Sequence, residues 1–263
     1  MHTILCFGDS NTFGSNPHGG RWPRSVRWTG LLQQFLGSDY YVIEEGLGGR
    51  NTIFDDPLEP GRNGLALLPV SLNSHKPLDL VVLSLGTNDC KVLFNANPKI
   101  IAKGLENLIK TVQTTSQGDD ATVPKILVIS PITIGKDIES TRFASYDYQS
   151  YEKSLQLAPL FEKVAQEYGC LFLDASTVAN PSETDQLHME AEDHEHLAKA
   201  LLPIIKKQFN DERETSFEEP IVPIVEKVME KPIPSEIPEV PTPKKSHAPL
   251  SFRIPGFSRK KEK

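Results

Sequence analysis

Four short segments of the chain carry groups that could together perform acyl transfer. Gly8-Asp9-Ser10-Asn11-Thr12 offers a hydroxyl nucleophile, and Glu45-Gly46-Leu47-Gly48-Gly49-Arg50 offers backbone N–H groups that a substrate can approach closely. Leu85-Gly86-Thr87-Asn88-Asp89 adds a side-chain amide, and Asp185-Gln186-Leu187-His188 adds an acid–base pair. A serine hydroxyl needs an adjacent base and donors aimed at the oxyanion. The segments therefore supply the parts of a serine acyl-enzyme mechanism.

Two Asp–His pairs have the same spacing and compete for the role of base. Asp185 stands three residues before His188, and Asp193 stands three residues before His196. That spacing lets both side chains reach one point within a helical turn. We expect Asp193 in the first turn of the last helix, where a carboxylate is favourable, and His196 on a face of that helix. His194 is expected to be exposed on the same helix.

The elements that must position these groups alternate between strand and helix. Short runs rich in Val, Ile and Leu predict strands at Thr3–Phe7, Tyr41–Glu44, Asp79–Leu85, Ile126–Ser130 and Cys170–Asp174. Helical patterns lie at Trp28–Leu36, from Asn97-Pro98 onward, at Tyr151–Tyr168 with Pro159 as a kink or break, and at Asp193–Phe209. The alternation predicts an α/β doubly wound, five-stranded parallel sheet with helices on both faces.

In such a sheet, ligands bind beyond the carboxyl ends of the strands. Ser10 follows the first strand, Gly49 the second and Asn88 the third, while Asp185 and His188 follow the fifth. All candidate groups are therefore expected at one edge. The long polar connection over residues 131–149 is expected to form the rim or lid of that site.

Each segment has a plainer interpretation when it is taken alone. Asp9 or Ser10 could cap a helix, and Gly48, Gly49 and Asn88 could be ordinary turn residues. Thr12 stands where a G-x-S-x-G nucleophile elbow needs glycine, and Asn51 stands where a dinucleotide fingerprint needs it. We also expect buried pairing among Asp9, Arg27 and Arg50.

The four segments, in this order, resemble the four blocks of the SGNH hydrolases, the GDSL-type serine esterases. Further similarity lies in Val26-Arg27-Trp28-Thr29-Gly30, Val42-Ile43-Glu44-Glu45-Gly46-Leu47 and Pro77-Leu78-Asp79-Leu80-Val81, which resemble the arylesterase/acyltransferase branch. The resemblance covers roughly residues 1–209. It implies a flavodoxin-like sheet, a Ser10, Asp185 and His188 triad, and an oxyanion hole made by the N–H groups of Ser10 and Gly49 and the amide of Asn88.

The resemblance also implies an enzyme without a cofactor or a metal ion. Its expected substrates are small molecules, namely short-chain or aryl esters, with acyl transfer to alcohols as a further reaction. Carbohydrate deacetylase, lysophospholipase or thioesterase activity on the same triad, and a binding protein that has lost catalysis, stay as alternatives. The branch usually has a small polar side chain where this chain has Gly48, which leaves the acyl preference open. A metal site is disfavoured because His194-Glu195-His196 is not H-E-x-x-H.

Composition limits the remaining classes. The net charge of −7 disfavours nucleic-acid binding, and no run approaches the ~20 apolar residues that span a membrane. Three widely spaced cysteines and a start without a signal peptide predict a cytoplasmic protein, and assembly into a homo-oligomer stays open. We expect a catalytic domain over residues 1–211. Residues 212–263 hold nine of the 21 prolines, first acidic and then basic, and are expected to be a disordered tail.

Overall fold

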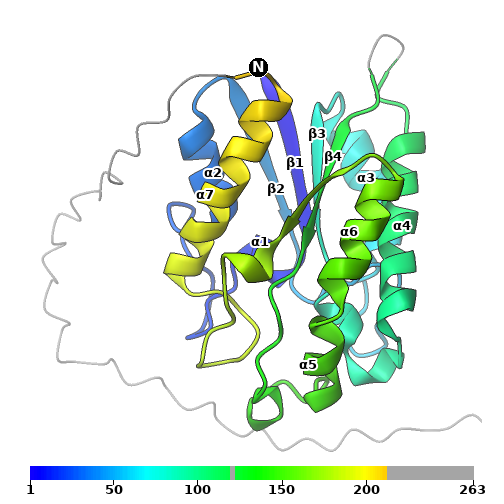
Figure 1. Ribbon diagram of the computed structural model, residues 1–263, viewed down its shortest axis with the longest axis vertical. Helices are drawn as coiled ribbons and strands as arrows, with labels where there is room; N and C mark the ends of the chain where they lie inside the picture. The colour runs from blue at the N-terminus through cyan, green and yellow to red at the C-terminus, as the bar shows by residue number, and fades with distance from the viewer. Residues whose placement is uncertain (119–121, 212–263) are drawn as a thin grey trace, which may run out of the picture. The chain divides into compact units, whose positions relative to one another are not determined.

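A five-stranded parallel sheet forms the centre of the protein in the computed structural model, which describes residues 1–118 and 122–211 (Figure 1). Its strand order is β2-β1-β3-β4-β5, and each neighbouring pair is parallel. The strands are β1 (His2–Gly8), β2 (Tyr40–Gly46), β3 (Leu80–Ser84), β4 (Lys125–Ser130) and β5 (Leu171–Asp174). The predicted fold class and flavodoxin-like order are therefore confirmed.

Helices cover both faces of this sheet. One face carries α2 (Trp28–Leu36) and α7 (Ala191–Gln208); the other carries α3 (Gly64–His75), α4 (Pro98–Thr114) and α6 (Leu157–Glu167) (Figure 1). Shorter elements lie in the connections: α1 (Ser10–Phe13), α5 (Tyr148–Ser154), and the 3₁₀ turns η1 (Asn88–Cys90), η2 (Val92–Phe94), η3 (Ile138–Ser140) and η4 (Ala175–Thr177).

The two layers follow from the apolar strands. Successive side chains of a strand point to opposite faces, so a continuous apolar run is stable only when both faces are covered. In β1, Ile4 and Cys6 pack into the cluster with α2 and α7, whereas Leu5 and Phe7 pack into the cluster with α3, α4 and α6. All four side chains are fully buried. Burial of each larger apolar side chain contributes about 1.5–3 kcal/mol.

Three strands end level with one another, and this sets the position of the site. Gly8 of β1 pairs in register with Gly46 of β2 and with Ser84 of β3. Gly8 allows the chain to turn tightly at this edge, because a Cβ there would lie 2.0 Å from Thr12 Oγ1 and 2.8 Å from the Ser84 carbonyl oxygen. The segments after β1, β2 and β3 therefore begin side by side.

Two helical regions differ from the sequence-based expectation. Helix α3 was not predicted, because Pro69 lies in its second turn, where proline usually interrupts a helix. The predicted helix over Tyr151–Tyr168 is two helices, and the chain breaks between Ser154 and Leu157 rather than at Pro159. Pro159 lies in the first turn of α6, where its missing N–H has no intrahelical acceptor to lose.

Two further expectations from the sequence concern the C-terminal tail and the absence of a membrane-spanning helix. The proposed Pro-rich tail over residues 212–263, and with it the boundary at residue 211, lies outside the described residues. Among the residues that are described, no helix is both long and apolar enough to cross a membrane.

Candidate active site

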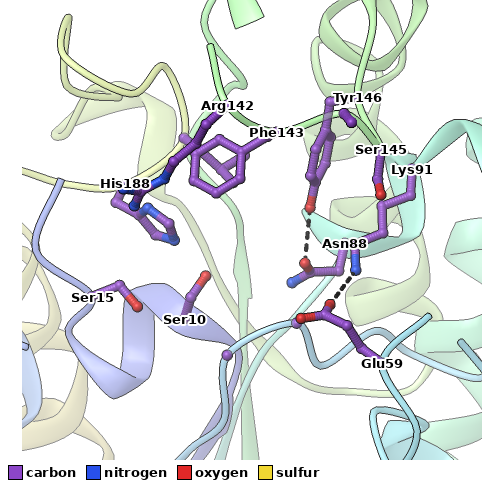
Figure 2. A pocket seen from close by; sticks show the side chains of 14 residues that line it. Ser10, Ser15, Glu59, Asn88, Lys91, Arg142, Phe143, Ser145, Tyr146 and His188 are labelled. Carbon is purple, nitrogen blue, oxygen red and sulfur yellow. Dashed lines mark hydrogen bonds and ion pairs between the residues drawn. The ribbon is translucent and has the colours of Figure 1, made fainter. Parts of the chain in front are cut away.

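A pocket of about 330 Å³ opens at the carboxyl edge of the sheet (Figure 2). Ser10, Gly49, Asn88 and His188, which come from four separate segments, all line it. The connection between β4 and α5 lines it as well, through residues 142–146, as expected for a rim. The structure thus brings the predicted groups together around one space that can hold a small ester.

Ser10 is the first residue of α1, immediately after the tight turn at the end of β1. The capping role that competed for this segment belongs to Asp9, whose Oδ1 accepts a hydrogen bond of 2.9 Å from the Asn11 N–H. The Ser10 hydroxyl is consequently not needed as a cap, and it points toward the imidazole of His188 in the pocket (Figure 2).

His188 is held by Asp185 through a short and buried contact. The Asp185 Oδ2 lies 2.6 Å from His188 Nδ1, while Oδ1 accepts the N–H groups of Leu187 and His188 at 3.0 and 2.9 Å. Burial alone would raise the pKa of Asp185, but the bonds from His188 and the backbone hold it below its usual range. An ionised Asp185 makes Nδ1 the protonated ring nitrogen, which leaves Nε2 as the acceptor.

The competing histidines lie elsewhere. The His196 side chain is 47% exposed on α7, and its nearest carboxylate is Glu192 at 3.7 Å. The expectation that His194 is exposed is wrong: this side chain is fully buried between α7 and α2, where Nδ1 accepts the Trp28 N–H at 3.4 Å. Burial lowers the pKa of His194 to about 3, so its ring is neutral. Of these histidines, the pocket is lined by His188.

Three candidate donors belong to residues that line the pocket: Ser10, Gly49 and Asn88. The backbone N–H groups of Ser10 and Gly49 donate to no other group in the described part of the chain. The Asn88 amide lies opposite, with Nδ2 donating to the Arg50 carbonyl at 3.0 Å and retaining a second N–H. Such an arrangement can bind a developing oxyanion, and each donor of this kind contributes roughly 3 kcal/mol to lowering a barrier.

Adjacent glycines differ sharply in their surroundings. Arg50 N–H donates to the Leu47 carbonyl at 3.1 Å, which closes a turn with Gly48 and Gly49 at its centre. Gly49 has φ +76°, as the third position of a type II turn requires. A Cβ on Gly49 would lie 2.7 Å from Glu59 Oε2, whereas a Cβ on Gly48 would meet nothing within 4 Å. The turn is therefore ordinary in geometry, and it places Gly49, whose N–H has no acceptor among the described residues, in the lining of the pocket.

A buried lysine connects the two sides of this donor set. Lys91 Nζ lies 2.8 Å from Asp56 Oδ2 and 2.7 Å from Glu59 Oε2. Lys91 follows the turn that carries Asn88, and Glu59 packs against Gly49. The ion pairs thus tie together the segments that supply two of the three donors.

The expected pairing among Asp9, Arg27 and Arg50 is wrong in its partners. Arg27 Nε pairs with Glu44 at 2.9 Å, and Arg50 donates to the carbonyl oxygens of Gly8, at 3.0 Å, and Glu45. Burial raises the pKa of Asp9 to about 6, although the Asn11 N–H, Thr87, His188 and Arg50 each act to lower it. Arg50 therefore hydrogen-bonds to the backbone at the ends of two strands and acts on Asp9 only through its charge, without a direct ion pair.

Sequence reasoning missed two residues that hold the site in place. The Asn11 side chain donates from Nδ2 to the Leu187 carbonyl at 3.2 Å and accepts the Met189 N–H through Oδ1 at 3.1 Å. It therefore hydrogen-bonds to the backbone on both sides of His188. Tyr146 donates its hydroxyl to Asn88 Oδ1 at 2.8 Å (Figure 2). Asn11 could have been noticed because it directly follows the candidate nucleophile, whereas Tyr146 was expected only as part of the rim over residues 131–149, and no sequence signal indicates its bond to Asn88.

Known proteins resemble this chain over most of its described length. The GDSL-like Lipase/Acylhydrolase family matches residues 6–200. The M. smegmatis aryl esterase is 37% identical, with 79% of this chain and 99% of that chain covered and a TM-score of 0.74. Est24, a carbohydrate acetylesterase from Sinorhizobium meliloti, is 35% identical, with 80% and 100% covered and a TM-score of 0.74. A putative arylesterase from Agrobacterium tumefaciens str. C58 is 37% identical, with 79% and 99% covered and a TM-score of 0.72.

A weaker match is to the uncharacterized lipoprotein YqeF of Bacillus subtilis (strain 168), which is 25% identical over 111 residues. It covers 42% of this chain and 42% of the relative, so the chain spans less than half of that protein's length. The family match and the structures at 35–37% identity agree with the order of the segments around the pocket. The chain belongs to the GDSL-like lipase/acylhydrolase family, the SGNH family of carboxylic ester hydrolases.

Proposed function

We propose that the protein hydrolyses short-chain esters through an acyl-enzyme on Ser10. His188 Nε2 accepts the hydroxyl proton as Oγ attacks the ester carbonyl, and Asp185 stabilises the imidazolium that forms. The N–H groups of Ser10 and Gly49 and the amide of Asn88 bind the oxyanion. His188 returns the proton to the departing alcohol, and water then releases the acid by the same steps.

The observation that carries this proposal is the convergence of four segments on one pocket. A hydroxyl, a buried Asp185–His188 pair at 2.6 Å and three donors surround the same space. A structural role would explain any one of them, but it would not explain why two residues that line the pocket have backbone N–H groups without an acceptor among the described residues.

The lining of the pocket supports a small acyl group. Gly48 contributes no side chain, and the charged side chains of Glu59, Lys91 and Arg142 interrupt the apolar part of the walls. A long acyl chain needs a continuous apolar channel, because burying alkyl groups against charged side chains gains little. Acetyl and propionyl esters are therefore the proposed substrates, with transfer to an added alcohol as a side reaction of the same acyl-enzyme.

A carbohydrate acetate is the second candidate for the natural substrate. The polar side chains that line the pocket match the hydroxyl groups of a sugar, and the similar protein Est24, at 35% identity, is a carbohydrate acetylesterase. Phe143, whose ring lies 5.7 Å from that of His188, instead favours an aryl alcohol. Rates on p-nitrophenyl acetate, phenyl acetate and acetylated xylose, measured side by side, decide between the two.

Covalent labelling tests the proposal itself. A fluorophosphonate should modify Ser10 alone, as found by mass spectrometry of the peptides, and p-nitrophenyl acetate should be hydrolysed. Ser15, which lines the same pocket, is the matched control, and Ser15→Ala should still be labelled on Ser10. Labelling that survives Ser10→Ala, or an unmodified Ser10 in protein that hydrolyses the ester, would refute the assignment.

The cytoplasmic location stays a prediction. The three cysteines are free thiols, and burial raises the pKa of each. Thiols of this kind are typical of a reducing compartment, which supports the proposal.

A further inference from the structure

Tyr146 is a buried tyrosine that comes from an irregular polar connection. Its side chain reaches from the segment between β4 and α5 to the turn after β3, where the hydroxyl donates to Asn88 Oδ1 at 2.8 Å (Figure 2). Only 6% of Tyr146 is exposed, and burial raises the pKa of its phenol well above 10, so the hydroxyl stays protonated as a donor. No step of the proposed mechanism uses this group directly.

The two ends of the Asn88 amide have different partners, and these set its orientation. Oδ1 accepts from Tyr146, whereas Nδ2 donates to the Arg50 carbonyl at 3.0 Å. A flipped amide would place Oδ1 against that carbonyl, so two acceptors would face each other. In the observed orientation the second N–H of Nδ2 remains for the substrate, and a donor on Oδ1 polarises that N–H further.

The segment that carries Tyr146 is docked on the turn that carries Asn88. Val92 N–H donates to the Ser145 carbonyl at 2.9 Å, and Ser150 Oγ donates to the Cys90 carbonyl at 2.9 Å. Ser145 and Ser150, which make these bonds, lie on either side of Tyr146 along the chain. The phenol is therefore fixed in relation to the amide instead of meeting it from a loosely held loop.

We propose that Tyr146 is a positioning residue for the oxyanion donor Asn88: its hydroxyl fixes Oδ1 so that the free N–H of Nδ2 points at the substrate carbonyl oxygen. The inference rests on the proposed function. Misaligning a donor weakens its bond to the transition state more than its bond to the bound ester, so kcat should fall and KM should change little.

A double-mutant cycle tests this role on p-nitrophenyl acetate. Tyr146→Phe keeps the ring and removes the hydroxyl, and it should lower kcat roughly tenfold with KM within about twofold. In the Asn88→Ala background the same change should have almost no effect on kcat, because no amide is left to align. Tyr148→Phe, on an exposed neighbouring tyrosine, is the matched control and should behave as the unmodified enzyme.

A further substitution separates the donor strength of the phenol from its packing. If Tyr146→Phe does not fold, 3-fluorotyrosine at this position retains the packing and makes the phenol a stronger donor. The change should alter kcat in the parent and not in the Asn88→Ala enzyme.

Defined results would overturn the inference. They are an unchanged kcat for Tyr146→Phe, an equal loss of kcat in both backgrounds, or a fluorotyrosine effect that does not depend on Asn88. All of these require an active parent enzyme. Failure of the proposed function is distinguishable, because then the parent itself neither hydrolyses the ester nor is labelled at Ser10.

Discussion

Alanine at Gly48 and at Gly49 should have opposite effects on stability, although the two residues are neighbours. Gly49 has φ +76°, and a side chain in this left-handed region costs about 1–2 kcal/mol. Its Cβ would also lie 2.7 Å from Glu59 Oε2, which must move while it is paired with Lys91 at 2.7 Å. Together these effects predict that Gly49→Ala lowers the free energy of unfolding by about 2 kcal/mol.

Gly48 lies outside the left-handed region, and its Cβ would meet nothing. Alanine there restricts the unfolded chain and should raise the free energy of unfolding by about 0.4–1 kcal/mol. For a domain of this size 1 kcal/mol corresponds to about 2–4 °C, so Gly49→Ala should unfold about 4–8 °C lower than the parent. Gly48→Ala should unfold at the parent temperature or slightly higher.

Thermal unfolding followed by circular dichroism measures both variants under one condition, and kcat on p-nitrophenyl acetate gives a second readout. Gly49→Ala should lower kcat because its N–H moves, whereas Gly48→Ala should mainly raise the preference for acetate over butyrate as its methyl group narrows the pocket. Equal melting temperatures for the two variants would refute the reasoning, since the geometry of the turn is the only basis for the difference.

Three other expectations concern activity and pH. His188→Ala should lose several orders of magnitude in kcat while His196→Ala stays near the parent, with both folded by circular dichroism; the opposite ranking would overturn the assignment of the base. Asn88→Ala should lower kcat roughly 10²–10³-fold with a modest change in KM, and an unchanged kcat in folded protein would remove it from the oxyanion hole. Burial raises the pKa of Asp9 from 3.8 to about 6, so the folded protein holds a proton that the unfolded chain releases, and its free energy of unfolding falls as pH rises through this range. Asp9→Asn cannot titrate, and between pH 4 and pH 7 its free energy of unfolding in urea should rise by up to about 3 kcal/mol relative to that of the parent. A difference between the two proteins that does not change with pH would contradict the raised pKa.

Local patterns in the sequence were sufficient for the sheet. The predicted strand Asp79–Leu85 is observed as β3 over Leu80–Ser84, because a fully buried strand must be apolar at every position. Helix α3 was missed because Pro69 hides its pattern, although Asn63 caps it as expected for a helix start. The order of strand and segment along the chain also placed Ser10, Gly49 and Asn88 correctly at one edge.

Tertiary contacts account for what the sequence could not supply. Nothing in the sequence around His194 distinguishes it from an exposed residue of a helix. The packing of α7 against α2 is what buries it. Tyr146 lies in a segment without periodicity, so nothing local indicates that its hydroxyl reaches Asn88. The partners of Arg50 are backbone carbonyls, which every residue has, and sequence cannot indicate which of them a guanidinium will find.

The hydrogen bonds from Asn11 to Leu187 and Met189 bear on the time during synthesis at which the enzyme can become active. Its partners are 176 and 178 positions away, so Ser10, the proposed nucleophile, is made early and His188, the proposed base, late. At about 5–20 residues per second, a ribosome needs roughly 10–40 s to add the intervening chain. A nascent chain whose His188 has not yet emerged from the ribosome already carries the Ser10 hydroxyl and the oxyanion donors, but it has no proton acceptor for that hydroxyl. The first turnover on a ribosome-bound chain therefore reports that the segment carrying His188 has joined the segment carrying Ser10, more than 170 positions earlier in the chain.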